Sequence, residues 1–145
     1  MPFPPPVPGL VIRYSYLWLS EHLQGREEGV KDRPCAIVLI AKSEEGRQTV
    51  AVLPITHTPP EKAELAVEIA SSVKRRLGLD GERSWVMLNE ANRFVWPGPD
   101  LRPAVRGDAD SVVFGLLPYK LFEEIKNRFD SAVRKRLTSV VPRSE

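Results

Sequence analysis

The hydrophobic and polar positions in the first half of the chain predict three strands. Residues 10–19, LVIRYSYLWL, mix β-branched and aromatic side chains, which is typical of a strand. Two apolar runs follow, CAIVLIA at 35–41 and TVAVLPI at 49–55, and the glycine-bearing turn between them predicts a hairpin. The polar stretch at 20–34 is expected to be a loop, and loops of this length in compact domains often carry function.

The pattern continues with shorter elements. ELAVEIA at 64–70 alternates and predicts a fourth strand, while SSVKRRLGLD at 71–80 starts with serines and contains Gly78, which favours a short helix or turn. Residues 83–96 are expected to form one or two strands, and the proline-rich segment 97–108 a connection.

The clearest helix is expected over residues 117–137, with Pro118 in its first turn. Its expected apolar face consists of Leu121, Phe122, Ile125, Phe129, Val133 and Leu137. We expect a single domain over 1–145, preceded by a proline-rich extension at 1–8. Short strands in sequence, with one short helix and one C-terminal helix, predict an α+β, mainly β fold that forms a small barrel or a strongly bent sheet.

Composition narrows the class of protein. The chain has 145 residues, 42% of them hydrophobic and 28% charged, and its net charge of +2 allows a local RNA-binding patch without the large excess typical of duplex-DNA binders. Cys35 is the single cysteine, so an internal disulfide is excluded, and its place in an apolar run predicts a buried, inert thiol. We see no targeting segment, and the apolar run at 35–41 is too short to cross a membrane, so we expect a soluble, cytoplasmic protein.

The usual cofactor and metal motifs are missing from the sequence. His22 and His57 are the only two histidines and lie in different expected loops, so a histidine-rich metal site is not expected, while an oxygen-based site stays open. Neither a P-loop nor a dinucleotide-binding glycine pattern occurs, and there is no nucleophile elbow. We therefore expect no cofactor.

Polar residues gather near the ends of the expected strands, and Arg33 stands beside Pro34 where the second strand begins. The others are Glu27, Glu28, Thr56, His57, Thr58, Asn89, Glu90, Asn92 and Arg93. An arginine fork binds phosphate oxygens, a glutamate or histidine can remove a proton from a ribose hydroxyl, and a threonine can hold a phosphate oxygen. Taken singly, each also fits a solvated charge or a turn. Sequence alone does not bring Arg33 to Thr56, and we expect them to meet if the first loop folds over the sheet.

Four segments together resemble the PemK/MazF family of toxin–antitoxin ribonucleases. They are PGLVIRYSY at 8–16, DRPCAIVL at 32–39, VAVLPITHT at 50–58 and FGLLPYKLFEEIKNRF at 114–129. The resemblance implies an SH3-like barrel with added helices, a homodimer, and metal-independent, sequence-specific cleavage of single-stranded RNA to a 2′,3′-cyclic phosphate and a 5′-hydroxyl. It also implies a small antitoxin with an acidic, disordered tail as a partner.

Carried over to this sequence, the resemblance makes Arg33 the catalytic arginine and Thr56 the phosphate-binding threonine. Glu28 lies five residues before Arg33, where some members have a functional glutamate, and the base or acid is Glu27, Glu28 or His57. The expected RNA-binding residues are Arg26, Thr58, Asn89, Glu90 and Arg93. Trp18, Trp85 and Trp96 are candidate stacking surfaces, of which at least two are expected to be core residues.

The chain departs from the family pattern in extra sequence at 68–85, which is expected to alter or cover the RNA groove. Asn89 and Glu90 are candidates for a later polar position of the family that has no firm counterpart here. Two other functions remain open, because barrels of this shape serve several roles. One is a non-catalytic growth inhibitor that binds a protein target of the topoisomerase type, and the other is an RNA-binding regulator.

Overall fold

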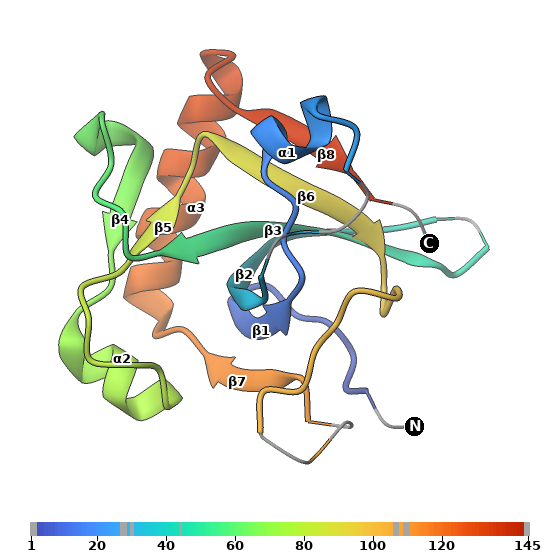
Figure 1. The fold of residues 1–145 in the computed structure, drawn as a ribbon, viewed down its shortest axis with the longest axis horizontal. Helices are drawn as coiled ribbons and strands as arrows, with labels where there is room; N and C mark the ends of the chain where they lie inside the picture. The colour runs from blue at the N-terminus through green and yellow to red at the C-terminus, as the bar shows by residue number, and fades with distance from the viewer. Residues whose placement is uncertain are drawn as a thin grey trace.

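A computed structural model describes residues 3–26, 29, 31–43, 45–105, 108 and 111–143 (Figure 1). It has the α+β, mainly β character expected from the sequence. The strands are β1 Leu10–Tyr14, β2 Arg33–Lys42, β3 Gln48–Thr56, β4 Ala66–Glu68, β5 Trp85–Met87, β6 Glu90–Val95, β7 Val113–Leu116 and β8 Ser139–Pro142. The helices are α1 Leu19–Leu23, α2 Ser71–Leu77 and α3 Tyr119–Arg134, with a 3₁₀ turn at Ala63–Leu65.

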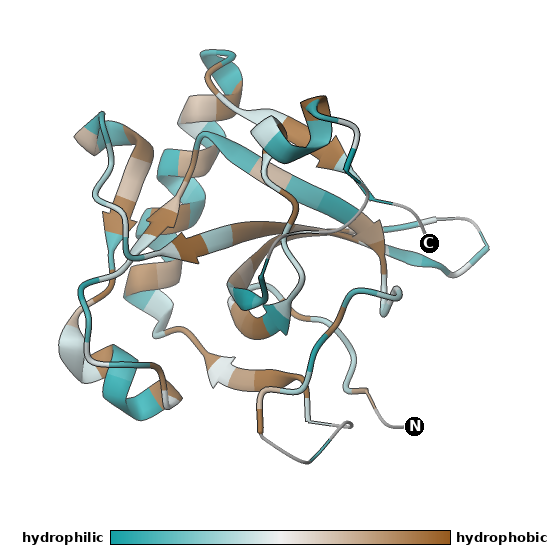
Figure 2. Cartoon of the chain, viewed as in Figure 1, coloured by the Kyte–Doolittle hydropathy of each residue, from teal (hydrophilic) through white to brown (hydrophobic). Residues whose placement is uncertain are grey.

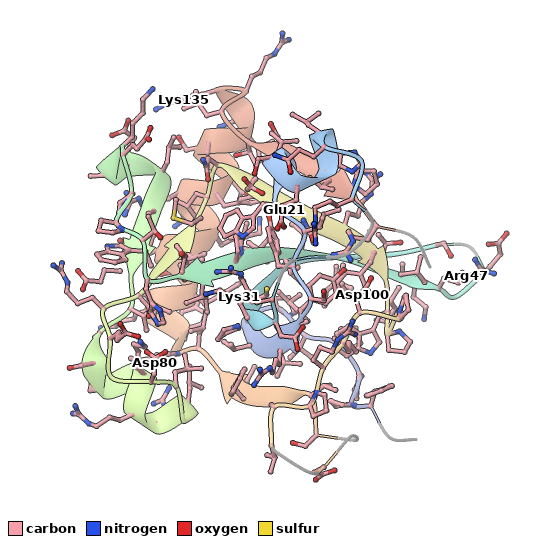
Figure 3. The ribbon with its side chains drawn as sticks, viewed as in Figure 1. Glu21, Lys31, Arg47, Asp80, Asp100 and Lys135 are labelled. Atoms are coloured by element: carbon pink, nitrogen blue, oxygen red, sulfur yellow. The ribbon has the colours of Figure 1, made fainter. Side chains whose placement is uncertain are left out.

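The expected hairpin of β2 and β3 is the longest pairing in the sheet. The antiparallel register runs from Cys35 opposite Pro54 to Lys42 opposite Gln48, with an irregularity between Ile37 and Leu39. Figure 1 shows the two strands reaching out to a turn, and Figure 3 places Arg47 at its tip. Alternate residues of β2 enter two different apolar clusters, which explains why this strand reads as a continuous apolar run.

Strand β3 organises the sheet, because it pairs with β2 along one edge and with two further strands along the other. Its residues 49–52 pair with β6, whereas its residues 55 and 56 pair with β5. Neighbouring strands pair in the order β4–β5–β3–β2–β1–β7. Strand β6 branches from β3 and pairs in parallel with β8. Within the described residues the end strands do not pair with one another, so the sheet is not closed.

Two hydrophobic clusters hold the sheet, one on each side of β2. The first packs α3 against the sheet through Ile125 and Phe129, together with Val38 and Leu53. The second is rich in aromatic rings, and Tyr14 stacks on Phe94 with ring centroids 4.6 Å apart. Figure 2 shows apolar residues concentrated along the central strands and polar residues toward the exposed turns and helix faces.

Several elements differ from the sequence expectation. The first strand ends at Tyr14, and the five-residue α1 spans the end of the expected strand and the start of the expected loop. Strand β8 was not expected, and α3 ends at Arg134. Leu137 therefore lies beyond the helix, and Val133 is also exposed, although both were expected on its apolar face. Cys35 is fully buried as expected, and burial raises the pKa of its thiol. Among the described residues, no helix is both long and apolar enough to span a membrane.

A buried ion pair ties the last described residue to the rest of the chain. The Arg143 guanidinium lies 3.0 Å from the Asp100 carboxylate, and both side chains are almost fully buried. Arg143 also donates to the backbone oxygen of Ser15 at 2.7 Å and to Asn92 Oδ1 at 3.0 Å. The Asn92 side chain in turn accepts a hydrogen bond from the Leu17 backbone N–H and donates one to the Leu17 backbone oxygen. The pair thus fixes the segment that leads from β1 to α1.

Replacing Arg143 by alanine should lower the free energy of unfolding by about 3–5 kcal/mol, because Asp100 would stay buried without its partner. Urea unfolding followed by tryptophan fluorescence measures the loss. The matched control is Arg134→Ala, an exposed arginine whose removal should change stability by no more than about 0.5 kcal/mol. Equal effects of the two substitutions would show that the Arg143 pair does not hold the fold.

Candidate functional site

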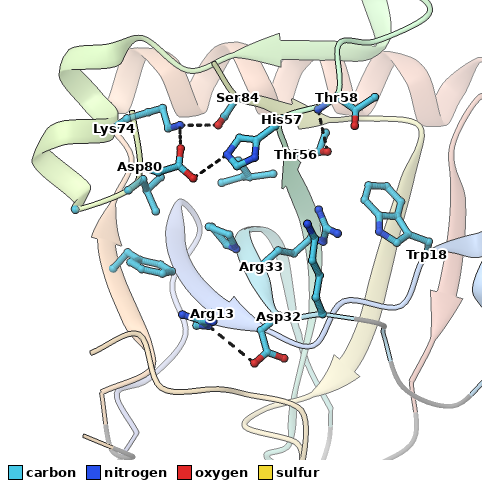
Figure 4. A pocket seen from close by; sticks show the side chains of 16 residues that line it. Arg13, Trp18, Asp32, Arg33, Thr56, His57, Thr58, Lys74, Asp80 and Ser84 are labelled. Carbon is cyan, nitrogen blue, oxygen red and sulfur yellow. Dashed lines mark hydrogen bonds and ion pairs between the residues drawn. The ribbon is translucent and has the colours of Figure 1, made fainter. Parts of the chain in front are cut away.

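A cavity of about 490 Å³ opens where β2 begins and β3 ends (Figure 4). Its walls come from β1, the loop before β2, the end of β3, α2, the segment between α2 and β5, and β7. The lining residues are Arg13, Trp18, Lys31, Asp32, Arg33, Pro34, Ile55, Thr56, His57, Thr58, Lys74, Gly78, Leu79, Asp80, Ser84 and Phe114. Three of the four expected catalytic residues, Arg33, Thr56 and His57, therefore share one cavity.

The hairpin itself brings Arg33 and Thr56 together. Cys35 lies opposite Pro54, and the same register continued by two residues sets Arg33 across from Thr56. Folding of the first loop over the sheet, through which we expected them to meet, is not needed, because antiparallel strands place the start of one beside the end of the next. Arg33 itself pairs with Tyr14 of β1, and Thr56 pairs with Trp85 of β5, so neighbouring strands hold both residues in place.

The Arg33 side chain has no hydrogen bond or ion pair with any other described residue, and its buried Nε lacks a partner. Its guanidinium lies over the Trp18 ring, 4.9 Å from the centroid. Neighbouring Asp32 does not neutralise it, because that carboxylate faces Arg13 at 4.0 Å and Arg102 at 3.6 Å. Among the described residues, the Arg33 fork thus contacts an aromatic face and no carboxylate, which leaves it able to receive an anion.

Polar groups of the loop after β3 lie beside Arg33. Thr56 is nearly buried, and its Oγ1 accepts a hydrogen bond from the Thr58 backbone N–H at 3.2 Å. That hydroxyl keeps its own proton to donate to a ligand. The His57 side chain is 46% exposed, so an imidazole that can carry a proton is open to the cavity.

The segment from α2 to β5 contributes residues that sequence reasoning missed. Lys74 is buried, and its ammonium donates to Asp80 Oδ1 at 2.7 Å, to Ser84 Oγ at 2.6 Å and to the backbone oxygen of Glu82. Asp80 Oδ2 lies 2.8 Å from His57 Nε2. The hydrogen bond from Lys74 holds the pKa of the Asp80 carboxyl below its usual range. The only sequence signal for this group of residues was the basic run KRR at 74–76, and such a run is typical of charge on a protein surface.

His57, Asp80 and Glu82 are the described residues whose ligand atoms come close enough to hold a metal ion, within 4.8 Å of one another. Their geometry fits hydrogen bonding better. The two carboxylates face opposite ring nitrogens, Asp80 at Nε2 and Glu82 at Nδ1, 3.6 Å away. A single ion binds only one of these nitrogens, and the Lys74 ammonium already occupies the other oxygen of Asp80.

A second cavity of about 650 Å³ adjoins the first and shares Trp18, Thr56 and Thr58 with it. Apolar and polar residues both line it, and the expected residues Asn89 and Glu90 are among them. Asn89 Oδ1 is buried without a partner among the described residues. Glu90 Oε1 accepts hydrogen bonds from the Leu19 backbone N–H and the Tyr16 hydroxyl, and burial raises the pKa of this carboxyl.

Other expected residues lie apart from both cavities. Arg26 and Arg93 are exposed, and neither lines a cavity. Glu27 and Glu28 fall outside the described residues. Of the three tryptophans, only Trp18 lines the cavities, while Trp85 is buried and Trp96 packs against the aromatic cluster.

The chain matches no protein-family model, and a search of curated proteins also finds no match.

The difference in unfolding free energy between the wild type and Asp80→Asn should depend on pH. The pKa of this carboxyl is lowered in the folded state, so its stabilising effect is fully present above the ordinary aspartate pKa, about 3.9. It is lost as the pH falls through the lower folded value. Urea unfolding from pH 7 down to pH 2 measures the difference, and a difference that stays constant throughout would contradict this assignment.

Proposed function

We propose that this protein is a metal-independent endoribonuclease of the PemK/MazF toxin type that cleaves single-stranded RNA at specific sequences. The observation that carries the proposal is the Arg33 guanidinium, which has no ion-pair partner among the described residues and shares a cavity with Thr56 and His57. An arginine and a threonine can stabilise the charge on a phosphoryl group, and a histidine can transfer the protons, so the three suit cleavage of a phosphodiester within RNA.

Charge supports a phosphate ligand in the first cavity. Four cationic side chains line it, Arg13, Lys31, Arg33 and Lys74, against the two carboxylates Asp32 and Asp80. Each carboxylate already faces a cation, Asp32 two arginines and Asp80 the Lys74 ammonium. The positive charge that stays available is therefore at Arg33 and Lys31, which suits one phosphodiester group of an RNA strand.

The proposed reaction proceeds within the RNA strand. The ribose 2′-oxygen attacks the adjacent phosphorus, and the bond from phosphorus to the 5′-oxygen breaks. The products carry a 2′,3′-cyclic phosphate and a 5′-hydroxyl. Arg33 stabilises the charge on the phosphoryl oxygens, and Thr56 donates a hydrogen bond to one of them. His57 or Glu28 takes the 2′-hydroxyl proton or gives one to the 5′-oxygen.

The fold is proposed to be a version of the SH3-like barrel in which short, mainly antiparallel strands bend around two apolar clusters. The RNA strand continues from the first cavity into the second, where Thr58, Asn89 and Glu90 contact it. Arg26 and Arg93 contact the backbone farther away. We further propose a homodimer that acts in the cytoplasm, and a small antitoxin whose acidic tail competes with RNA for the same cations.

Arg33→Ala should lower RNA cleavage by about 100- to 1000-fold, since one electrostatic group serves a charged transition state. The assay follows a mixed single-stranded RNA substrate, with end-group analysis of the products and urea unfolding to verify the fold. Arg134→Ala, an exposed arginine outside both cavities, is the control and should keep wild-type activity. Full activity of the Arg33 variant would remove the residue from the mechanism.

Cleavage should continue in EDTA, because Arg33 and the proton-transfer groups supply what the reaction needs. The assay compares initial rates with chelator and with added magnesium, manganese or zinc. Glu82→Gln serves as a second check, because it removes one of the three groups whose ligand atoms lie within 4.8 Å of one another, and cleavage by this variant should be equally insensitive to chelator. Activity that disappears with chelator and returns with one of these ions would overturn the metal-free mechanism.

A further inference from the structure

The segment from α2 to β5 lies in the part of the chain that departs from the PemK/MazF pattern, and it contributes three polar residues to the first cavity. Lys74 lies on α2, and Asp80 and Ser84 follow in the connection to β5. Figure 4 shows these three side chains meeting beside His57, which directly follows β3.

We propose that Lys74 and Asp80 are positioning residues that fix the ring of His57, so that Nδ1 is the nitrogen that exchanges a proton with RNA. The proposal rests on the proposed function, because it assigns a role to the same cavity. Lys74 and Asp80 would thereby set the tautomer of His57, and the additional segment would serve to supply them.

Asp80 is held from three directions. Its Oδ1 accepts from the Lys74 ammonium at 2.7 Å and from the Glu82 backbone N–H at 3.1 Å, and its Oδ2 faces His57 Nε2 at 2.8 Å. An ionised carboxylate only accepts hydrogen bonds, so Nε2 must carry the proton in this pair. The neutral ring then has an unprotonated Nδ1, which is the form able to accept the proton of a 2′-hydroxyl.

Lys74 makes this support rigid. Its side chain is 4% exposed, and its three N–H groups are used by Asp80, Ser84 and the backbone oxygen of Glu82. A buried ammonium with every donor satisfied has little freedom to move. The Asp80 carboxylate is therefore fixed before any RNA binds.

The other charged groups around His57 do not fix the second ring nitrogen. The Glu82 carboxylate lies 3.6 Å from Nδ1, beyond hydrogen-bond distance, and its side chain is 73% exposed. Arg13, Lys31, Asp32 and Arg33 line the same cavity, and no hydrogen bond joins any of them to His57 in the described part of the chain. Nδ1 is thus the nitrogen left available to a substrate.

The tautomer can be read directly by ¹⁵N NMR of the imidazole. The chain has two histidines, so a His22→Gln background leaves His57 as the only signal. At the alkaline end of a titration we expect a protonated Nε2 and an unprotonated Nδ1. Asp80→Asn should shift the ring toward the other tautomer, whereas the control Glu82→Gln should leave it unchanged. A protonated Nδ1 in the parent protein, or no change in the Asp80 variant, would overturn the proposal.

A double-mutant cycle then tests whether Asp80 works through His57. Asp80→Asn should lower cleavage by at least about tenfold, and by no more than the 100- to 10,000-fold that a general acid–base group itself contributes. In a His57→Gln background the same substitution should have no further effect. An equal loss in both backgrounds would show that Asp80 acts elsewhere. If the parent protein cleaves no RNA while the NMR result is as expected, the proposed function fails and the positioning of His57 stands.

Discussion

The antiparallel pairing of β2 with β3 is the interaction on which the rest of the structure depends. Seven residue pairs join the strands, and the side chains of β2 enter apolar clusters on both faces. A strand buried on both faces cannot slip by one residue without exchanging its two sets of side chains. The same register sets Arg33 beside Thr56 at the end of the ladder, so the forces that fold the sheet also determine the geometry of the cavity.

A cationic fork inside a cavity needs an explanation, because arginines removed from water are usually paired with an anion. Asp32 is adjacent in sequence, yet it faces Arg13 and Arg102. The partner of Arg33 is instead the Trp18 ring, which supports the guanidinium without neutralising it. An aromatic partner keeps the net charge available to a ligand, and this distinguishes the arrangement from an ordinary surface ion pair.

Local patterns predicted most of the fold. The apolar runs gave β2 and β3, and the three- and four-residue spacing gave α3, since both signals depend on neighbours in sequence. Strand β8 was missed because it is stabilised by parallel pairing with β6, more than forty residues away, and its four residues are mostly exposed. Arg33, Thr56 and His57 could be predicted to lie near strand ends, and the structure places all three in one cavity. Asp80 could not, since an aspartate between a helix and a strand is ordinary loop chemistry.

Lys74 shows how a requirement of burial can shape a site. Moving a lysine ammonium out of water costs roughly several kcal/mol of folding free energy, as for any buried ion, unless its donors find acceptors. The connection between α2 and β5 supplies these acceptors, which are the Asp80 carboxylate, the Glu82 carbonyl and the Ser84 hydroxyl. A carboxylate in this position has one oxygen turned to the lysine and the other turned outward. The outward oxygen faces His57, so the interaction that satisfies a buried charge in one element also sets the orientation of a side chain on another.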